Sequence, residues 1–285
     1  MEIDVLASFL GIPGGDVGAS TITIHGIPLS DLQQAQNFHG SIITVRGGMQ
    51  RGLPLASPNQ AGLLIQGMIF QSYANWISDD MNINFVVVPS GQTLDSPGNF
   101  SFTWVKGQSL SSAIQNALQI VYPSNKYKIK MNILNTYATS QTIADKKSTL
   151  TEFSQFIYSL TNSSVNISLW DYNTILVTDN SIQSNLVKLA FADLIGQPKW
   201  VRFKVMQFMT IMRADIQVGT TINMPQGLIN SPGTVTTTAA ATPSQAKYQT
   251  SFRGNFTVQS VRHVGNFRDP DGASWASIFE AFPNG

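Results

Sequence analysis

The sequence predicts an α+β fold that is mainly β, with two small β-barrel-like domains flanking an α+β insertion domain. Both ends of the chain contain short segments in which apolar and polar residues alternate, a pattern typical of strands. Between them, two segments repeat apolar residues at helical spacing. A chain of 285 residues is long enough for one large domain or for two to three ordinary ones. We therefore expect a first β domain with an N-terminal arm at 1–95, an α+β insertion at 96–183 and a second β domain at 184–285.

The first domain begins with a glycine-rich arm at residues 1–20, which we expect to be irregular. Four strands are expected after the arm, at Thr21–Ile24, Gly40–Arg46, Leu63–Tyr73 and Met81–Val88. Ser30 is a candidate N-cap for a short helix over Leu32–Phe38. Residues 47–62 contain four glycines and two prolines, which indicates a long hairpin loop or flap. Strands this close together in sequence predict a small barrel or a sandwich.

The insertion has two helices, and each leads into a strand. Apolar residues at helical spacing predict helices at 110–121 and 150–160. Ser109 caps the first helix, and Thr149 with Glu152 forms a capping box at the start of the second. Strands are predicted at 127–133, where lysines occupy one face, and at 165–169, followed by a turn and a partner strand at 175–178. The order of a helix followed by a strand occurs twice, as a weak internal duplication would produce.

The second β domain is organised around the segment Trp200–Pro225. Large apolar residues fall on both faces of this segment, with Phe203 and Val205 on one and Phe208 on the other, so we expect it to be covered on both faces. A turn near Gly219 leads to a short strand that ends at Pro225. Further strands are expected at 252–264 and 275–282, joined by a turn at 267–273. The small, polar residues 231–249 predict a mobile loop.

The composition narrows the class of protein. Charged residues are 12% of the chain, about half of the usual share, and hydroxyl and amide side chains take their place. Such a surface fits a subunit packed against neighbours, or simply a polar soluble domain. The absence of cysteine excludes disulfides, thiolate metal sites and a cysteine nucleophile. No Lys or Arg precedes Arg46 and no apolar run is long enough for a membrane span, so we expect folding in a cytoplasm without membrane insertion.

Residues with catalytic or metal-binding spacing are missing from the sequence. The three histidines, His25, His39 and His263, are too far apart in sequence for ligand spacing. A calcium loop at Asp269 and Asp271 fails because apolar residues occupy its first and last ligand positions. We therefore expect no catalytic residues, no metal, no cofactor and no enzyme activity.

The two ends of the chain carry opposite charge. Residues 1–95 hold two arginines against seven carboxylates, whereas residues 183–268 hold nine Lys and Arg residues against two carboxylates. A basic region can indicate nucleic acid binding, but these charges are scattered rather than clustered. Complementary faces between subunits or domains explain both halves together. The candidate inter-subunit residues are Asp79, Asp80, Arg202, Lys204 and Arg213.

Three stretches give the sequence a resemblance to a known family. They are the helix start GQSL-x-x-A-I at Gly107–Ile114, the pattern D-x-x-V-G-x-x-I-x-x-P at Asp215–Pro225, and the closing hairpin Gly254–Pro283 with its His263-x-Gly265 and Trp275. Together with the order of a β group, an α+β insert and a β group, the chain resembles the baseplate hub proteins of contractile phage tails. The match covers most of the chain from about Ile22 onwards.

The resemblance implies a homotrimer in which two barrel-like domains per chain form a pseudo-six-fold ring. Such a ring joins the tail tube to a spike and lets DNA pass through its lumen. The implied partners are other copies of the chain, a tail tube protein and baseplate wedge or tape-measure proteins. Because the sequence ends soon after the second β group, we expect a separate spike protein. The implied location is the virion tail baseplate, after assembly in the host cytoplasm.

Two other interpretations stay open at this point. The chain fits another tail structural subunit, such as a tube or distal tail protein, or a β module that binds carbohydrate or nucleic acid. Ring formation without ligand favours a tail subunit, whereas tight, salt-sensitive binding of the isolated protein to DNA favours the binding module.

Overall fold

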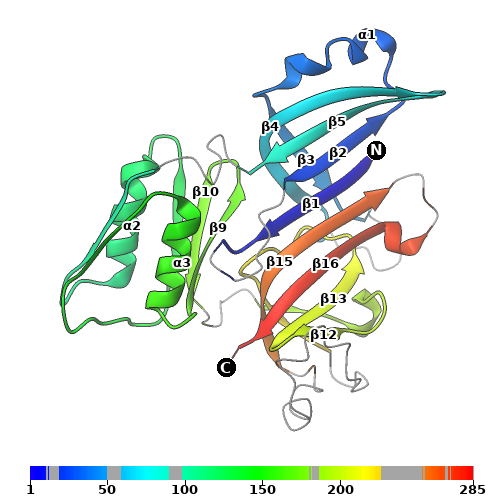
Figure 1. Ribbon diagram of the computed structural model, residues 1–285. Coiled ribbons are helices and arrows are strands. Elements are labelled where there is room, and N and C mark those ends of the chain that lie inside the picture. Colours follow the sequence, from blue (N-terminus) through cyan, green and yellow to red (C-terminus); the bar gives the residue numbers. More distant parts are fainter. Residues whose placement is uncertain are drawn as a thin grey trace. The chain divides into compact units, whose positions relative to one another are not determined.

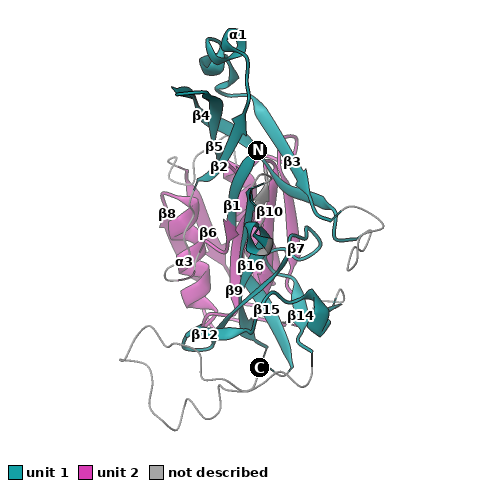
Figure 2. Ribbon diagram, turned by 90° about the vertical axis from the view of Figure 1, so that its right-hand side faces the viewer, with its two compact units in different colours: residues 1–6, 19–87, 182–285 teal, residues 7–18, 88–181 magenta. Residues whose placement is uncertain are grey.

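The computed structural model describes residues 1–10, 12, 19–49, 59–89, 98–179, 181, 186–225, 252, 254–266, 269 and 271–284. The chain forms two compact units (Figure 2). Unit 1 contains Met1–Leu6, Ala19–Val87 and Ile182–Gly285, and unit 2 contains Ala7–Gly18 and Val88–Ser181. The expected loop at 231–249 and most of the expected flap, residues 50–58, lie outside the described residues. The division into three domains and the closure of each β group into a barrel stay predictions.

Eleven strands among the described residues of unit 1 form one sheet. They are β1 (Glu2–Ser8), β2 (Ser20–His25), β3 (Ile42–Gly47), β4 (Gly62–Ile77), β5 (Asp80–Val88), β11 (Leu186–Lys188), β12 (Lys199–Arg202), β13 (Val205–Ile211), β14 (Thr221–Asn223), β15 (Asn255–Asn266) and β16 (Trp275–Pro283). Nine of them follow the order β12-β13-β16-β15-β1-β2-β5-β4-β3 (Figure 1). β14 pairs with both β15 and β11 beside this path. The fold is therefore α+β and mainly β, as the sequence predicts.

β1 joins the two β groups of unit 1 because it lies between β15 and β2. It pairs antiparallel with β2, with Glu2 opposite Thr23 and Asp4 opposite Thr21. Ile3 and Val5 alternate into the hydrophobic core. The expectation of an irregular arm is therefore wrong for residues 2–8, because alternation of polar and apolar residues makes this segment a strand. Residues 13–18 of the expected arm lie outside the described part of the chain.

The predicted strands of the first β group are all present as β2 to β5, and β4 extends further than expected, to Ile77. The short helix is divided into α1 (Leu29–Leu32) and a 3-10 turn η1 (Ala35–Phe38). Ser30 does not cap it. The N-cap position is Pro28, and no side chain accepts a hydrogen bond from the first turn.

The segment from Trp200 is a hairpin rather than one continuous strand. β12 ends at Arg202, opposite Val205 on β13, and the two residues between them form the turn. Lys204 has a φ of 54°, which a continuous strand does not allow. Phe203 is consequently 46% exposed, so its predicted burial is wrong, whereas Phe208 is buried and stacks on Phe279 with ring centroids 4.9 Å apart. β13 buries one face fully and the other only in part.

Unit 2 contains both predicted helices, α2 (Leu110–Val121) and α3 (Leu150–Leu160). Its strands are β6 (Phe100–Trp104), β7 (Lys128–Asn132), β8 (Ile143–Lys147), β9 (Val165–Asp171) and β10 (Thr174–Asp179). They form a sheet in the order β7-β10-β9 and a separate β6-β8 pair. The predicted caps are present: Ser109 Oγ accepts from Ser112 N at 3.2 Å, and Thr149 Oγ1 accepts from Glu152 N at 3.1 Å. Strands β6 and β8 are additional to the prediction, and β6 contributes Phe100 and Phe102 to the core.

None of the described helices is long and apolar enough to cross a membrane.

Candidate functional site

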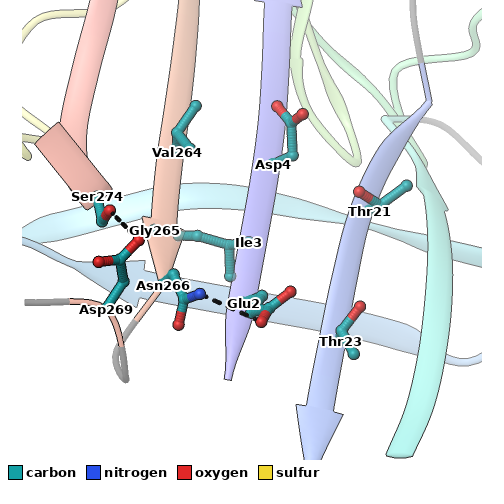
Figure 3. Close-up of a pocket in the computed structure, with 10 residues that line it drawn as sticks. All are labelled: Glu2, Ile3, Asp4, Thr21, Thr23, Val264, Gly265, Asn266, Asp269 and Ser274. Atoms are coloured by element: carbon teal, nitrogen blue, oxygen red, sulfur yellow. Dashed lines mark hydrogen bonds between the residues drawn. The ribbon is translucent and has the colours of Figure 1, made fainter. Parts of the chain in front are cut away.

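A pocket of about 330 Å³ beside β1 collects acidic and hydroxyl side chains (Figure 3). Glu2 and Asp4 reach it from β1, and Thr21 and Thr23 reach it from β2. Asp269 lines it from the turn that follows β15. The pocket is therefore acidic, and it can bind a ligand only if these carboxylates are free of partners within the chain.

Each carboxylate of the pocket already has a partner in the chain. Both Asp4 oxygens accept from Arg262, at 2.8 and 2.6 Å. Glu2 accepts from Asn266 Nδ2 at 3.3 Å. Hydrogen bonds from Asp271 N and from Ser274 Oγ hold the pKa of the Asp269 carboxyl below its usual value. These contacts tie β1 to β15 and order the following turn. Among the described residues, no group of three His, Asp or Glu side chains is placed to hold a metal.

A serine and a histidine meet in the core of unit 1. His263 Nδ1 lies 2.7 Å from Ser277 Oγ, and the same oxygen accepts from Arg213 N at 3.1 Å. Both side chains are buried, and burial lowers the pKa of His263 to about 4. The imidazole is therefore neutral at pH 7. Because the Ser277 hydroxyl has no exposed surface, a substrate cannot reach it, and the pair acts as packing and hydrogen bonding between β15 and β16.

Three of the five predicted interface residues bond within their own chain. Arg213 is the most enclosed, with a side chain only 6% exposed. Its guanidinium makes two bonds to Asp215, at 2.7 and 2.6 Å. Arg202 forms an ion pair with Glu280 on β16, and Asp80 lies 3.0 Å from His25 Nδ1. The charge count of the sequence could not show these pairings, because it does not say which charges meet inside one chain.

The other two predicted residues, Asp79 and Lys204, are exposed at the turns of two hairpins. Asp79 lies between β4 and β5, and Lys204 lies between β12 and β13. In the sheet order these hairpins are separated by β16, β15, β1 and β2. One chain therefore does not bring the acidic and basic candidates together. Whether neighbouring chains do so stays a prediction.

Large exposed apolar side chains concentrate on one part of unit 1, a feature that the sequence analysis missed. They come from α1, η1, β3 and the end of β4: Leu29, Phe38, Ile42, Phe70, Tyr73, Trp76 and Ile77. We call this group the apolar edge, because β3 is the last strand of the sheet order. Surfaces of this kind mark interaction sites in soluble proteins. The available signal was the far end of β4, where Phe70, Tyr73, Trp76 and Ile77 place large apolar groups on both strand faces.

No family model matches the sequence, and no curated protein matches it. Several solved structures are similar in fold. The first is the E. coli c3393 protein, described as a component of the type VI secretion system with structural similarity to the T4 bacteriophage tail proteins gp27 and gp5. The alignment covers 100% of this chain and 73% of that one, with a TM-score of 0.57 and 9% identity.

Two tail proteins are similar over nearly their whole length. The 43 kDa tail protein of prophage MuSo2 from Shewanella oneidensis aligns with 99% of this chain and 93% of its own, at a TM-score of 0.52 and 9% identity. The tail protein from Neisseria meningitidis MC58 aligns with 100% of this chain and 92% of its own, at a TM-score of 0.56 and 11% identity. The chain has the fold of these tail proteins.

Proposed function

We propose that this chain is a structural subunit of a phage tail, the baseplate hub that joins the tail tube to a spike. The observation that carries the proposal is the fold likeness, which extends over the whole chain and over more than nine-tenths of two tail proteins. A likeness of this extent includes unit 2 as well as the sheet of unit 1. It therefore supports a tail subunit rather than a widespread β module inserted in an unrelated protein.

The architecture of unit 1 fits a subunit that assembles into a ring. The nine-strand path of its sheet has two different ends, β3 and β12, each paired on one side among the described residues. A subunit with two different contact surfaces can join its copies head to tail, and such contacts close into a ring when the rotation per copy allows it. In the proposed ring, three copies supply six β groups in pseudo-six-fold arrangement, and DNA passes through the lumen without sequence-specific contacts.

The proposed partners are other copies of the chain, the tail tube protein, a separate spike protein, and baseplate wedge or tape-measure proteins. The proposed role requires no cofactor and no catalysis. The protein then resides in the virion tail and assembles in the host cytoplasm. A tube or distal tail protein is the alternative within the same class. The number of copies in the ring distinguishes it from the proposed hub, which has three.

Native mass spectrometry of the full chain, alone and co-expressed with its tube and spike partners, tests the proposal. We expect three copies per assembly, retained when the tube protein co-purifies. A chain that stays monomeric with every tail partner present would contradict the hub assignment. Tight, salt-sensitive DNA binding by such a monomer would instead support the nucleic-acid-binding module.

A further inference from the structure

The hairpin between β4 and β5 ends in an apolar tip. Trp76 and Ile77 are 66% and 67% exposed, and the exposed carboxylate of Asp79 follows them. The Trp76 Nε1–H donates to the carbonyl oxygen of Ser78 at 2.9 Å, which holds the indole in one orientation. An aromatic side chain that is already ordered loses little conformational entropy on binding. We call Trp76, Ile77 and Asp79 the tip. It combines an ordered apolar anchor with one negative charge.

The other end of the same sheet has an outer edge that runs along β13 from residue 194 to the turn at residue 204. Ile195 N donates to Met209 O at 2.8 Å, and β12 continues the pairing along β13. Phe203 is exposed at the end of this edge formed by the β12–β13 turn, and Phe191 is exposed just before the opposite end. The Lys204 Nζ lies 5.6 Å from the centroid of the Phe203 ring. Lys199 is also exposed here, so this basic edge combines aromatic surface with positive charge.

We propose that the tip of one copy docks on the basic edge of the next copy, an inference that rests on the proposed ring. Trp76 and Ile77 cover Phe203, and Asp79 faces the ammonium of Lys204. The two surfaces differ, so each copy offers one of each, and the contact repeats around the ring until it closes. The opposite charges steer the encounter and fix the register of the contact.

Charge and shape favour a second copy over other classes of partner. A nucleic acid fits the basic edge, but it does not fit the tip, because the Asp79 carboxylate repels phosphate. A second copy of the chain presents both complements in equal number. It also covers Trp76 and Ile77, two of the three most exposed large apolar side chains among the described residues, which is the arrangement expected for residues at the centre of an interface.

Charge reversal provides the first test, read by native mass spectrometry and sedimentation of the full chain. Asp79→Lys and Lys204→Asp should each weaken assembly, and the double variant should restore it. Asp is chosen at position 204 because it tolerates the positive φ there. Trp76→Ser with Ile77→Ser should raise the dissociation constant by roughly 30-fold or more, as expected for a central aromatic anchor. The control is Ile120→Ser with Leu134→Ser, whose side chains in unit 2 are similarly exposed and which should assemble normally.

A mixing experiment tests the head-to-tail arrangement. A chain with the tip substituted at 76 and 77 keeps an intact basic edge, and a chain with Phe203→Ser and Lys204→Asp keeps an intact tip. Each alone should be monomeric, and their mixture should form dimers that stop at two copies, because only one junction per pair is intact.

Two results would overturn the inference. If the wild type forms rings and the tip and charge variants form them equally well, other surfaces form the ring. The proposed function would then stand. A wild-type chain that never assembles, even with the tube and spike proteins, would contradict both the docking contact and the proposed function. Circular dichroism of every variant confirms that the fold is kept, and these positions are exposed at the end of β4 or in turns, where substitution has little effect on folding.

Discussion

Lowering the pH from 7 to 4 should destabilise unit 1 through His263. The pKa of this histidine is about 4 in the folded chain because burial disfavours the imidazolium, whereas an unfolded histidine titrates near 6.5. A depressed histidine pKa means that the unfolded state binds the proton first. The contribution of the neutral His263 to the free energy of unfolding is therefore fully present above pH 6.5, and it is lost as the pH falls toward 4. Linkage gives a loss of about 2 kcal/mol by pH 5 and about 3 kcal/mol by pH 4.

Urea unfolding of the wild type and of His263→Gln at pH 7, 6 and 5 measures this effect. Glutamine keeps a polar group near Ser277 Oγ but does not titrate, so the variant should be less stable at pH 7 and should lose about 2 kcal/mol less than the wild type between pH 7 and 5. The carboxylates of the chain are common to both proteins, and their contribution cancels in the comparison. Equal losses in the two proteins, or a titration of His263 near pH 6.5 by NMR, would refute the burial argument.

Four substitutions test other parts of the fold. Phe208→Ala removes a buried ring stacked on Phe279 and should cost about 3 to 5 kcal/mol in thermal or urea unfolding, whereas Phe203→Ala at the exposed turn should change stability by less than about 0.5 kcal/mol. Asp179→Ala removes the buried acceptor of the Leu134 and Asn135 amides, at 2.9 and 2.8 Å, so hydrogen exchange at 133–138 should become faster. Gly265→Ala should cost about 1 to 3 kcal/mol, because the new Cβ would lie 2.7 Å from the Trp275 ring; a melting temperature equal to the wild type would contradict the packing.

Local structure could be predicted from the sequence wherever one short-range pattern determined it. The capping box of Thr149 and Glu152 involves residues three positions apart, and it is present in the structure. The hairpin turn at Phe203 and Lys204 could not be predicted in the same way. A two-residue turn leaves the alternation of apolar and polar residues unbroken, so the segment looks like one strand until the pairing of Arg202 with Val205 is known.

Non-local features required the three-dimensional structure. β1 lies beside β15, whose residues follow it by about 250 positions in the chain, and no local pattern predicts such a neighbour. The pairing of the candidate interface residues could not be predicted from the sequence either. The sequence identified Arg213 as a charge available to a partner, but its guanidinium donates hydrogen bonds to Asp215, two residues away. Trp76 is of a residue type common in cores, and only the structure shows that two thirds of its side chain is exposed.

Single-particle electron microscopy of the chain co-expressed with its tube and spike proteins tests the central claim most directly. The proposed hub predicts closed rings of three chains with an open lumen and six similar β lobes around it, stacked on the tube at one face and on the spike at the other. Monomeric particles, or the chain absent from assembled tubes and spikes, would contradict the claim.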